Sequence, residues 1–329
     1  MTKLTFIIIL YFFSNFNVFA SETKGVITTI KPIESLVNAV IGDTGKTVSL
    51  IPPEISPHEF RLKPSDVRIL QNSNIVFYIS SHLETGIVKM FKNLPKNIKT
   101  INLMEETGID HLSIRDNEAW ELHDHDDHDK HDAKDEKHDD HDKHDAKDEK
   151  HDDHDKHDAK DDIHIWLDPD NAIKIVRKIN KELSLFFPKN AMTYNDNSSK
   201  FINELESLKI ELKKELLPIK DKPYIVFHDA YQYFERAFEL NAIGSIALEN
   251  DVASSPKQIS FIKDKILKSQ ATCVFQEPQF DSKLVKTVVE GTKVRIGTLD
   301  PIGVNILEKE NFYLQLLRNM SKSLKKCLG

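Results

Sequence analysis

The sequence predicts an α/β fold made of two lobes with parallel sheets. Short apolar runs alternate with longer segments of helical period in both halves of the chain, and such alternation is typical of parallel sheets covered by helices. About 300 residues follow a short apolar leader, which is enough for two domains. A long helical stretch separates the two halves, where it is placed to join them.

The first 20 residues have the pattern of a secretory signal peptide. Lys3 gives a positive start, residues 4–13 form an apolar run, and residues 18–20 supply small side chains for cleavage after Ala20. The run is too short to span a bilayer, and no Cys follows it that would carry a lipid anchor. We therefore expect a protein exported to a bacterial periplasm, without a stable membrane anchor.

The first half alternates predicted strands and helices. A helix opens with Pro32 and a short one with Pro64, because proline is favoured at the first helical position. The apolar runs that predict strands cover residues 26–30, 48–51 and 75–80.

A long helix is predicted over residues 188–218, after a helix over residues 169–187. Proline stands at both ends of the long segment, and at about 1.5 Å per residue it spans roughly 43 Å, more than one lobe needs. We expect it to join an N-terminal lobe, residues 21–187, to a C-terminal lobe, residues 219–329. Its apolar side chains keep helical spacing: Tyr194, Phe201, Leu205, Leu208, Leu212 and Leu216.

The second half repeats the alternation. The predicted strands cover residues 224–227, 242–247, 272–276 and 293–297. The predicted helices cover residues 231–238, 256–269, 282–290 and 312–326.

Residues 123–162 contain an acidic repeat, HDDHDKHDAKDEK, which occurs twice and then in part. The segment holds 17 Asp and 2 Glu against 8 Lys, a net of −11, so the rest of the chain is near neutral and gives no case for nucleic acid as a partner. It lacks Val, Ile, Leu and aromatic residues, which predicts a disordered loop. Its imidazoles predict weak zinc binding, and a purely solvating tract is the alternative. They are His123, His125, His128, His131, His138, His141, His144, His151, His154 and His157.

Three other histidines are placed to bind a metal. His58 follows a predicted strand, His228 ends another, and His164 stands where the acidic segment gives way to an apolar one. Ligands bind at the carboxyl ends of strands in parallel sheets, and three neutral imidazoles suit Zn²⁺ with one position left open. The alternative for each is a lone hydrogen-bonded histidine, which is the interpretation we favour for His82 and His111.

Five longer stretches form a recognisable set of motifs: SPHEFRLKPSD (56–66), HIWLDP (164–169), VFHDAYQYFE (226–235), FQEPQF (275–280) and GTLDPIG (297–303). In these stretches the chain resembles the zinc-specific, ZnuA-type branch of the cluster A-I family, the substrate-binding proteins of ABC importers. The resemblance covers nearly the whole chain after the leader. It implies two lobes joined by a rigid helix, with the metal in the cleft between them. It also implies His58, His164 and His228 as the ligands of a transported Zn²⁺, and partnership with a membrane permease and its ATPase. We expect a monomer.

The two cysteines, Cys273 and Cys327, are able to pair in an oxidising compartment, with two unpaired buried thiols as the alternative. The family's paired cysteines fall on these two positions.

The fourth metal ligand is left open by the sequence. Some zinc-branch members have Glu directly before the first ligand histidine, whereas this chain has Pro57. Water, Glu59 or Asp300 can take the position. Asp300 matches a metal-binding Asp of manganese-type relatives, and its alternative role is to cap a turn.

Two other classes of function were weighed against zinc capture. A zinc hydrolase needs a general base and a substrate pocket, and the chain has no HExxH motif, so we do not expect an enzyme. A manganese or iron binder, or an adhesin on the same fold, is expected to have Glu where this chain has His228.

Overall fold

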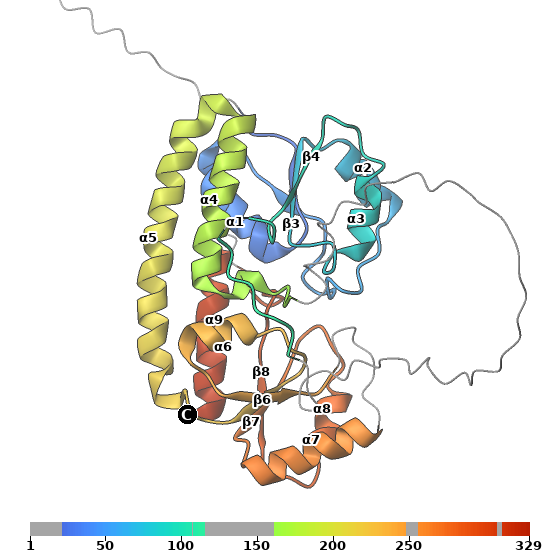
Figure 1. Ribbon diagram of the computed structural model, residues 1–329, viewed down its shortest axis with the longest axis vertical. Helices are drawn as coiled ribbons and strands as arrows, with labels where there is room; N and C mark the ends of the chain where they lie inside the picture. The colour runs from blue at the N-terminus through green and yellow to red at the C-terminus, as the bar shows by residue number, and fades with distance from the viewer. Residues whose placement is uncertain (1–21, 107, 116–160, 248–255, 308–310) are drawn as a thin grey trace, which may run out of the picture.

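The computed structural model describes residues 22–106, 108–115, 161–247, 256–307 and 311–329. Within these ranges the chain forms two four-stranded sheets, all of whose strand pairs are parallel, with helices packed on them. The predicted two-lobed α/β fold is therefore confirmed (Figure 1). The predicted signal peptide and almost all of the acidic repeat lie outside the described residues.

The first sheet has the strand order β2-β1-β3-β4. Its strands are β1 (Val26–Thr28), β2 (Val48–Ser49), β3 (Ile75–Tyr78) and β4 (Lys99–Asn102). Its helices are α1 (Lys31–Ile41), α2 (Pro64–Gln71) and α3 (Thr85–Phe91). Strand β4 and helix α3 are not predicted by the sequence pattern. The strand is an edge strand with only Ile101 fully buried, and the helix has seven residues, too few to show a clear period.

The second sheet repeats this arrangement with the order β6-β5-β7-β8. Its strands are β5 (Tyr224–Val226), β6 (Ala242–Ser245), β7 (Cys273–Gln276) and β8 (Arg295–Thr298), close to the four predicted ones. Its helices are α6 (Gln232–Phe238), α7 (Pro256–Ser269) and α8 (Lys283–Val289). In both sheets the first strand of the lobe is an inner strand.

Helix α5 (Ala191–Leu216) lies beside both lobes, antiparallel to α4 (Pro169–Phe186) (Figure 1). Short 3₁₀ turns at Pro188–Asn190 and Leu217–Ile219 flank it, so the helical stretch matches the one predicted for residues 188–218. All six apolar side chains that define its predicted stripe are buried. The assignment of residues 21–187, 188–218 and 219–329 to two lobes and a connecting helix stays a prediction.

The last helix, α9 (Phe312–Leu328), contacts α1 of the first lobe as well as α5. The amide of Tyr313 donates to Oγ of Ser35 on α1 at 3.0 Å. Trp166 Nε1 donates to the carbonyl of Pro301 at 2.9 Å, and the Tyr313 hydroxyl donates to the carbonyl of Trp166. The segment after β8 thus makes hydrogen bonds to residues of the first lobe.

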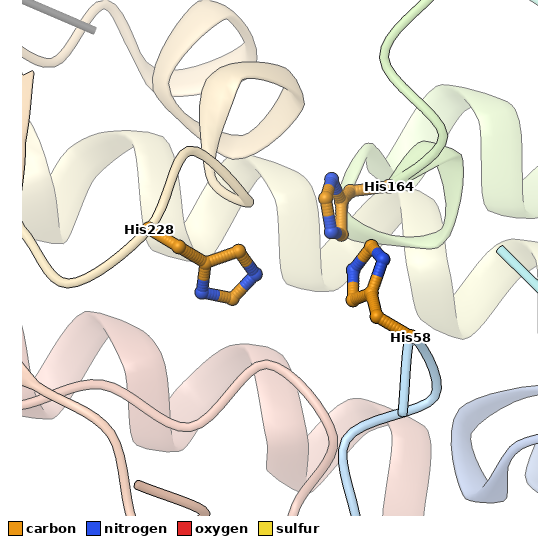
Figure 2. Close-up of side chains that lie close together, drawn as sticks. All are labelled: His58, His164 and His228. Carbon is orange, nitrogen blue, oxygen red and sulfur yellow. The ribbon is translucent and has the colours of Figure 1, made fainter. Parts of the chain in front are cut away.

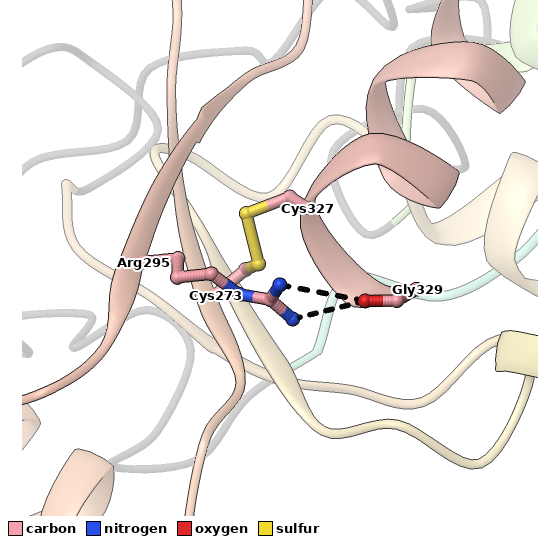
Figure 3. The surroundings of a disulfide bond; sticks show 4 residues. All are labelled: Cys273, Arg295, Cys327 and Gly329. Carbon is pink, nitrogen blue, oxygen red and sulfur yellow. Dashed lines mark hydrogen bonds between the residues drawn. A yellow bond between two sulfur atoms is a disulfide. The ribbon is translucent and has the colours of Figure 1, made fainter.

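A disulfide bond between Cys273 and Cys327 joins β7 to α9 (Figure 3). The two Cα atoms are 6.1 Å apart, and both side chains are buried. Beside the bond, the guanidinium of Arg295 donates to the carbonyl of Gly329 at 3.4 Å. This is the pairing that the sequence predicts, and it fastens the C-terminal helix to the second sheet.

No helix in the described part of the chain is long and apolar enough to cross a membrane.

Candidate metal centre

Three histidines from distant parts of the chain converge between the lobes (Figure 2). His58 lies in the loop after β2, His164 directly precedes a 3₁₀ turn at Ile165–Leu167, and His228 is the second residue after β5. One ring nitrogen of each lies within 4.8 Å of the others. The ring centroids are 5.4 Å apart for His164 and His228, 5.6 Å for His58 and His164, and 6.0 Å for His58 and His228.

His164 is held by the carboxyl group of Asp162. Oδ1 of Asp162 lies 2.9 Å from the His164 amide nitrogen and 2.8 Å from its ring Nδ1. In its ionised form the Asp162 carboxylate can only accept, and this form places the ring proton on Nδ1 and leaves a lone pair on Nε2. That Nε2 is buried and has no hydrogen-bond partner among the described residues. A buried, unpaired ring nitrogen beside two other imidazoles is what a metal ligand requires.

His228 is held in the same way by Glu277. Its Nδ1 lies 2.7 Å from Oε1 of Glu277, the first residue after β7, and both side chains are almost completely buried. Carboxylates that hold the second nitrogen of a ligand histidine fix its tautomer and its orientation, and they make the metal-binding nitrogen more basic. Two of the three histidines therefore carry this support.

Burial sets the protonation of the cluster. It lowers the pKa of His58 and of His164 well below the ordinary value, and the neighbouring imidazoles lower both further. Burial also raises the pKa of Asp162 to about 7, against the opposing effect of the His164 amide. Near neutral pH, His58 and His164 are thus neutral, the form that binds a metal.

The cluster faces a small pocket of about 10 Å³, whose walls come from both lobes. Such a volume corresponds to roughly one water molecule. Apart from the histidines, the pocket is lined by Ser56, Pro57, Leu83, Trp166, Glu277, Gln279, Phe280, Pro301 and Ile302. The site has room for an ion or a water, enclosed mainly by apolar side chains.

The two predicted candidates for a fourth ligand differ in their surroundings. Glu59 is exposed. Asp300 is partly buried, and its Oδ1 accepts from the amides of Gly303 at 2.7 Å and Ile302 at 3.3 Å, which is the turn-capping role weighed above. Neither belongs to the histidine cluster. Ligation by either residue stays a prediction.

Sequence reasoning missed the two supporting carboxylates and misplaced the end of the acidic loop. The predicted disordered segment ran to residue 162, but Asp161 pairs with Ser113 in an antiparallel bridge and Asp162 is only 4% exposed. In the sequence, Asp162 looks like the last residue of the repeat. Its position two residues before His164 is nevertheless a signal that it could contact that histidine. The ten loop histidines, predicted as weak zinc ligands, lie outside the described residues. His82 is exposed, and Nδ1 of His111 lies 3.2 Å from Asp161, so both have the ordinary surface roles expected of them.

Fold and site together define a two-lobed α/β protein with a candidate metal centre between its lobes. A family model described as "Zinc-uptake complex component A periplasmic" matches residues 26–327. The high-affinity zinc uptake system protein ZnuA of Brucella suis is 43% identical over 311 residues, 94% of this chain and 93% of that protein. The protein of the same name from Haemophilus ducreyi is 36% identical over 303 residues, 92% of this chain and 93% of its own length. The chain belongs to the ZnuA family.

Solved structures agree on the fold. A crystal structure of ZnuA has a TM-score of 0.72 at 22% identity and covers 94% of this chain and all of that one. A laminin-binding adhesin from Streptococcus agalactiae has a TM-score of 0.71 at 20% identity, with 93% of this chain covered. The same architecture therefore occurs in proteins with different names, and the particular function depends on the site.

Proposed function

We propose that the protein captures Zn²⁺ with His58, His164 and His228 and delivers it to the permease of an ABC importer. The observation that carries this proposal is the convergence of three imidazole nitrogens within 4.8 Å of one another in a buried pocket. Two of the rings are oriented by buried carboxylates, as ligand histidines commonly are. Three nitrogen ligands suit zinc better than manganese, which prefers oxygen. The ZnuA family is a zinc-uptake family, which agrees with this choice.

The ion is cargo in this account, and the protein is not an enzyme. A catalytic zinc needs a substrate beside its open position. The pocket of about 10 Å³ corresponds to an ion or one water molecule, without room for an organic substrate. Water is the simplest fourth ligand, since Glu59 is exposed and the Asp300 carboxylate already accepts from three backbone amides.

The protein is proposed to act in the periplasm as a monomer, after cleavage behind Ala20. The family's periplasmic description and the disulfide between Cys273 and Cys327 support an oxidising compartment. The partner is the membrane permease of a zinc importer together with its ATPase.

The test is a zinc competition titration against a chromogenic chelator, on protein purified free of metal. One tight site per chain is expected. Single replacements by Ala at His58, His164 or His228 should each weaken it by more than the roughly 10- to 100-fold that an outer carboxylate contributes. His82→Ala, an exposed histidine outside the cluster, is the matched control. If a variant lacking all three histidines kept its tight site, the proposal would be wrong.

A further inference from the structure

Tyr233 lies where the segment that carries His164 meets the helix that follows His228. It is the second residue of α6, and its side chain is fully buried. Its hydroxyl donates to the carbonyl of Asp162 at 2.8 Å and accepts from the amide of Leu112 at 3.1 Å. One hydroxyl group therefore bonds to both chain segments that flank the acidic repeat.

We call these two segments the loop stem, residues 112–115 and 161–162. The stem is paired with itself, because the amide of Asp162 donates to the carbonyl of Leu112 at 2.7 Å and Ser113 bridges Asp161. Gln232 of α6 adds a further bond, from its Nε2 to the carbonyl of Ser113 at 3.2 Å. Side chains of α6 thus form hydrogen bonds with the backbone of the stem, and these bonds require no particular side chain on the stem itself.

A buried ion-pair cluster fastens the other end of the stem. The guanidinium of Arg115 makes a two-pronged contact with Asp229, with Nε 2.8 Å from Oδ2. Its NH1 lies 2.7 Å from Oε2 of Glu235 on α6. Both carboxyl groups are nearly buried, at 4% and 6% side-chain exposure. Asp229 directly follows His228, so this contact ties the stem to the residue next to a metal ligand.

These contacts form a continuous path between two of the three histidines. Starting from His228, the chain leads into α6, Tyr233 bonds to the backbone of Asp162, and the Asp162 side chain holds Nδ1 of His164. A zinc–nitrogen bond is about 2.0–2.1 Å long with little tolerance, so a small shift of the His164 ring changes the bond it makes.

We propose that Tyr233 is a positioning residue of the metal centre, which acts through the loop stem and Asp162 to set where Nε2 of His164 lies. The inference rests on the proposed role of the three histidines as zinc ligands. It adds that the ends of the acidic repeat are part of the site's framework, although Tyr233 itself touches no metal. A stem that only closed a surface loop would not be connected to a ligand in this way.

The test compares Tyr233→Phe with Tyr194→Phe. Tyr194 on α5 is a matched control, because it is equally buried and its hydroxyl also makes two hydrogen bonds, with Thr23 at 2.6 Å and Asn190 at 3.1 Å. None of these three residues lines the metal pocket. Three quantities are measured: zinc affinity by competition, thermal unfolding of the metal-free protein, and the visible spectrum of the Co²⁺ form, whose bands report coordination geometry.

The expected result is that Tyr233→Phe weakens zinc binding about 10-fold, at the lower end of outer-shell effects, and shifts the Co²⁺ bands. Tyr194→Phe should lower the unfolding temperature but leave zinc affinity and spectrum unchanged. The proposal is overturned if Tyr233→Phe leaves the zinc affinity and the Co²⁺ spectrum unchanged. It is also overturned if Tyr233→Phe and Tyr194→Phe lower the zinc affinity equally. Should Tyr233→Phe fail to fold, Arg115→Lys replaces it. This variant keeps the charge without the two-pronged contact, and the same results support or overturn the role of the stem.

His164→Ala separates this inference from the proposed function. If His164→Ala still binds zinc tightly, the assignment of the ligands fails and the positioning role fails with it. If His164→Ala loses tight zinc binding while Tyr233→Phe keeps the affinity of the unmodified protein, only the positioning role fails.

Discussion

Oε1 of Glu277 lies 2.7 Å from Nδ1 of His228, and the two residues come from the ends of neighbouring strands of the second sheet. Glu277→Gln keeps a carbonyl oxygen at this position but removes the charge that makes the imidazole a stronger base. We expect zinc affinity to fall by about 10-fold. Competition titration measures this, and the unfolding temperature of the metal-free variant shows whether its fold is intact. An unchanged affinity would mean that Glu277 does not support a ligand.

The same contact changes the design of a metal-preference experiment. His228→Glu alone would place a second carboxylate beside Glu277, and like charges at short range oppose each other's ionisation. The double variant His228→Glu with Glu277→Gln avoids this conflict. We expect its ratio of zinc to manganese affinity to fall, because a hard oxygen replaces a nitrogen, while zinc still binds more tightly in absolute terms. The ratio is measured by titrating both metals, with Glu277→Gln as the control. An equal ratio in the two proteins would contradict the role given to His228.

The effect of deleting the acidic repeat on zinc affinity should depend on whether the deletion includes Asp162. Removing residues 124–158 leaves Asp161 and Asp162 in place, so the tight zinc site should persist. Extending the deletion through Asp162 removes the carboxylate that holds His164, and the affinity of the tight site should then drop. Isothermal titration of both deletions gives the comparison. Loss of the tight site in the shorter deletion would show that the repeat itself supplies a main ligand.

The pH dependence should separate the two kinds of zinc binding. Imidazoles in water protonate near pH 6.5, so the weak uptake expected of the loop histidines should fade below about pH 6. Burial lowers the pKa of His58 and His164, so protons compete directly with zinc for these ring nitrogens only at lower pH. Burial raises the pKa of Asp162 to about 7, and its protonation removes a charge that supports His164 without removing a ligand. Titrations of the full chain should therefore show tight and weak zinc binding at pH 7.5, and tight binding without the weak binding at pH 5.5. Simultaneous loss of both would contradict the assignment of the tight site to buried histidines.

The disulfide should stabilise the fold without touching the site. Its partners are 54 residues apart in sequence. A closed loop of that length is expected to add about 4 kcal/mol to the free energy of unfolding. The double variant Cys273→Ala, Cys327→Ala should therefore unfold at lower denaturant and bind zinc as before. Alkylatable thiols in the unreduced periplasmic protein would show that the bond does not form there.

The sequence predicted the regular elements that have a clear apolar pattern. Strands β5 and β7 and the long helix α5 follow from runs or stripes of buried side chains. The edge strand β8 was also predicted, although none of its four residues is buried. The sequence pattern missed β4, an edge strand with one fully buried residue, and α3, which is too short for periodicity. It also did not show that α9 contacts α1, since the bond from Tyr313 to Ser35 joins residues 278 apart.

The site was predicted only in part, for a related physical reason. Strand ends and family motifs pointed to His58, His164 and His228, but their supporting carboxylates depend on contacts that a linear pattern does not contain. Glu277 is 49 residues from His228, and Asp162 looks like one more member of an acidic repeat. The buried Asp162 and the other Asp residues of the repeat have the same side chain, so only the folded structure shows which of them supports a histidine.

The most direct test of the central claim is anomalous diffraction at the zinc absorption edge from crystals of the mature protein loaded with one equivalent of zinc. We predict one strong peak between the lobes, about 2.0–2.1 Å from one ring nitrogen each of His58, His164 and His228, with Nε2 as the atom on His164 and His228. A peak elsewhere, or one that is not bound by all three of these rings, would contradict the account.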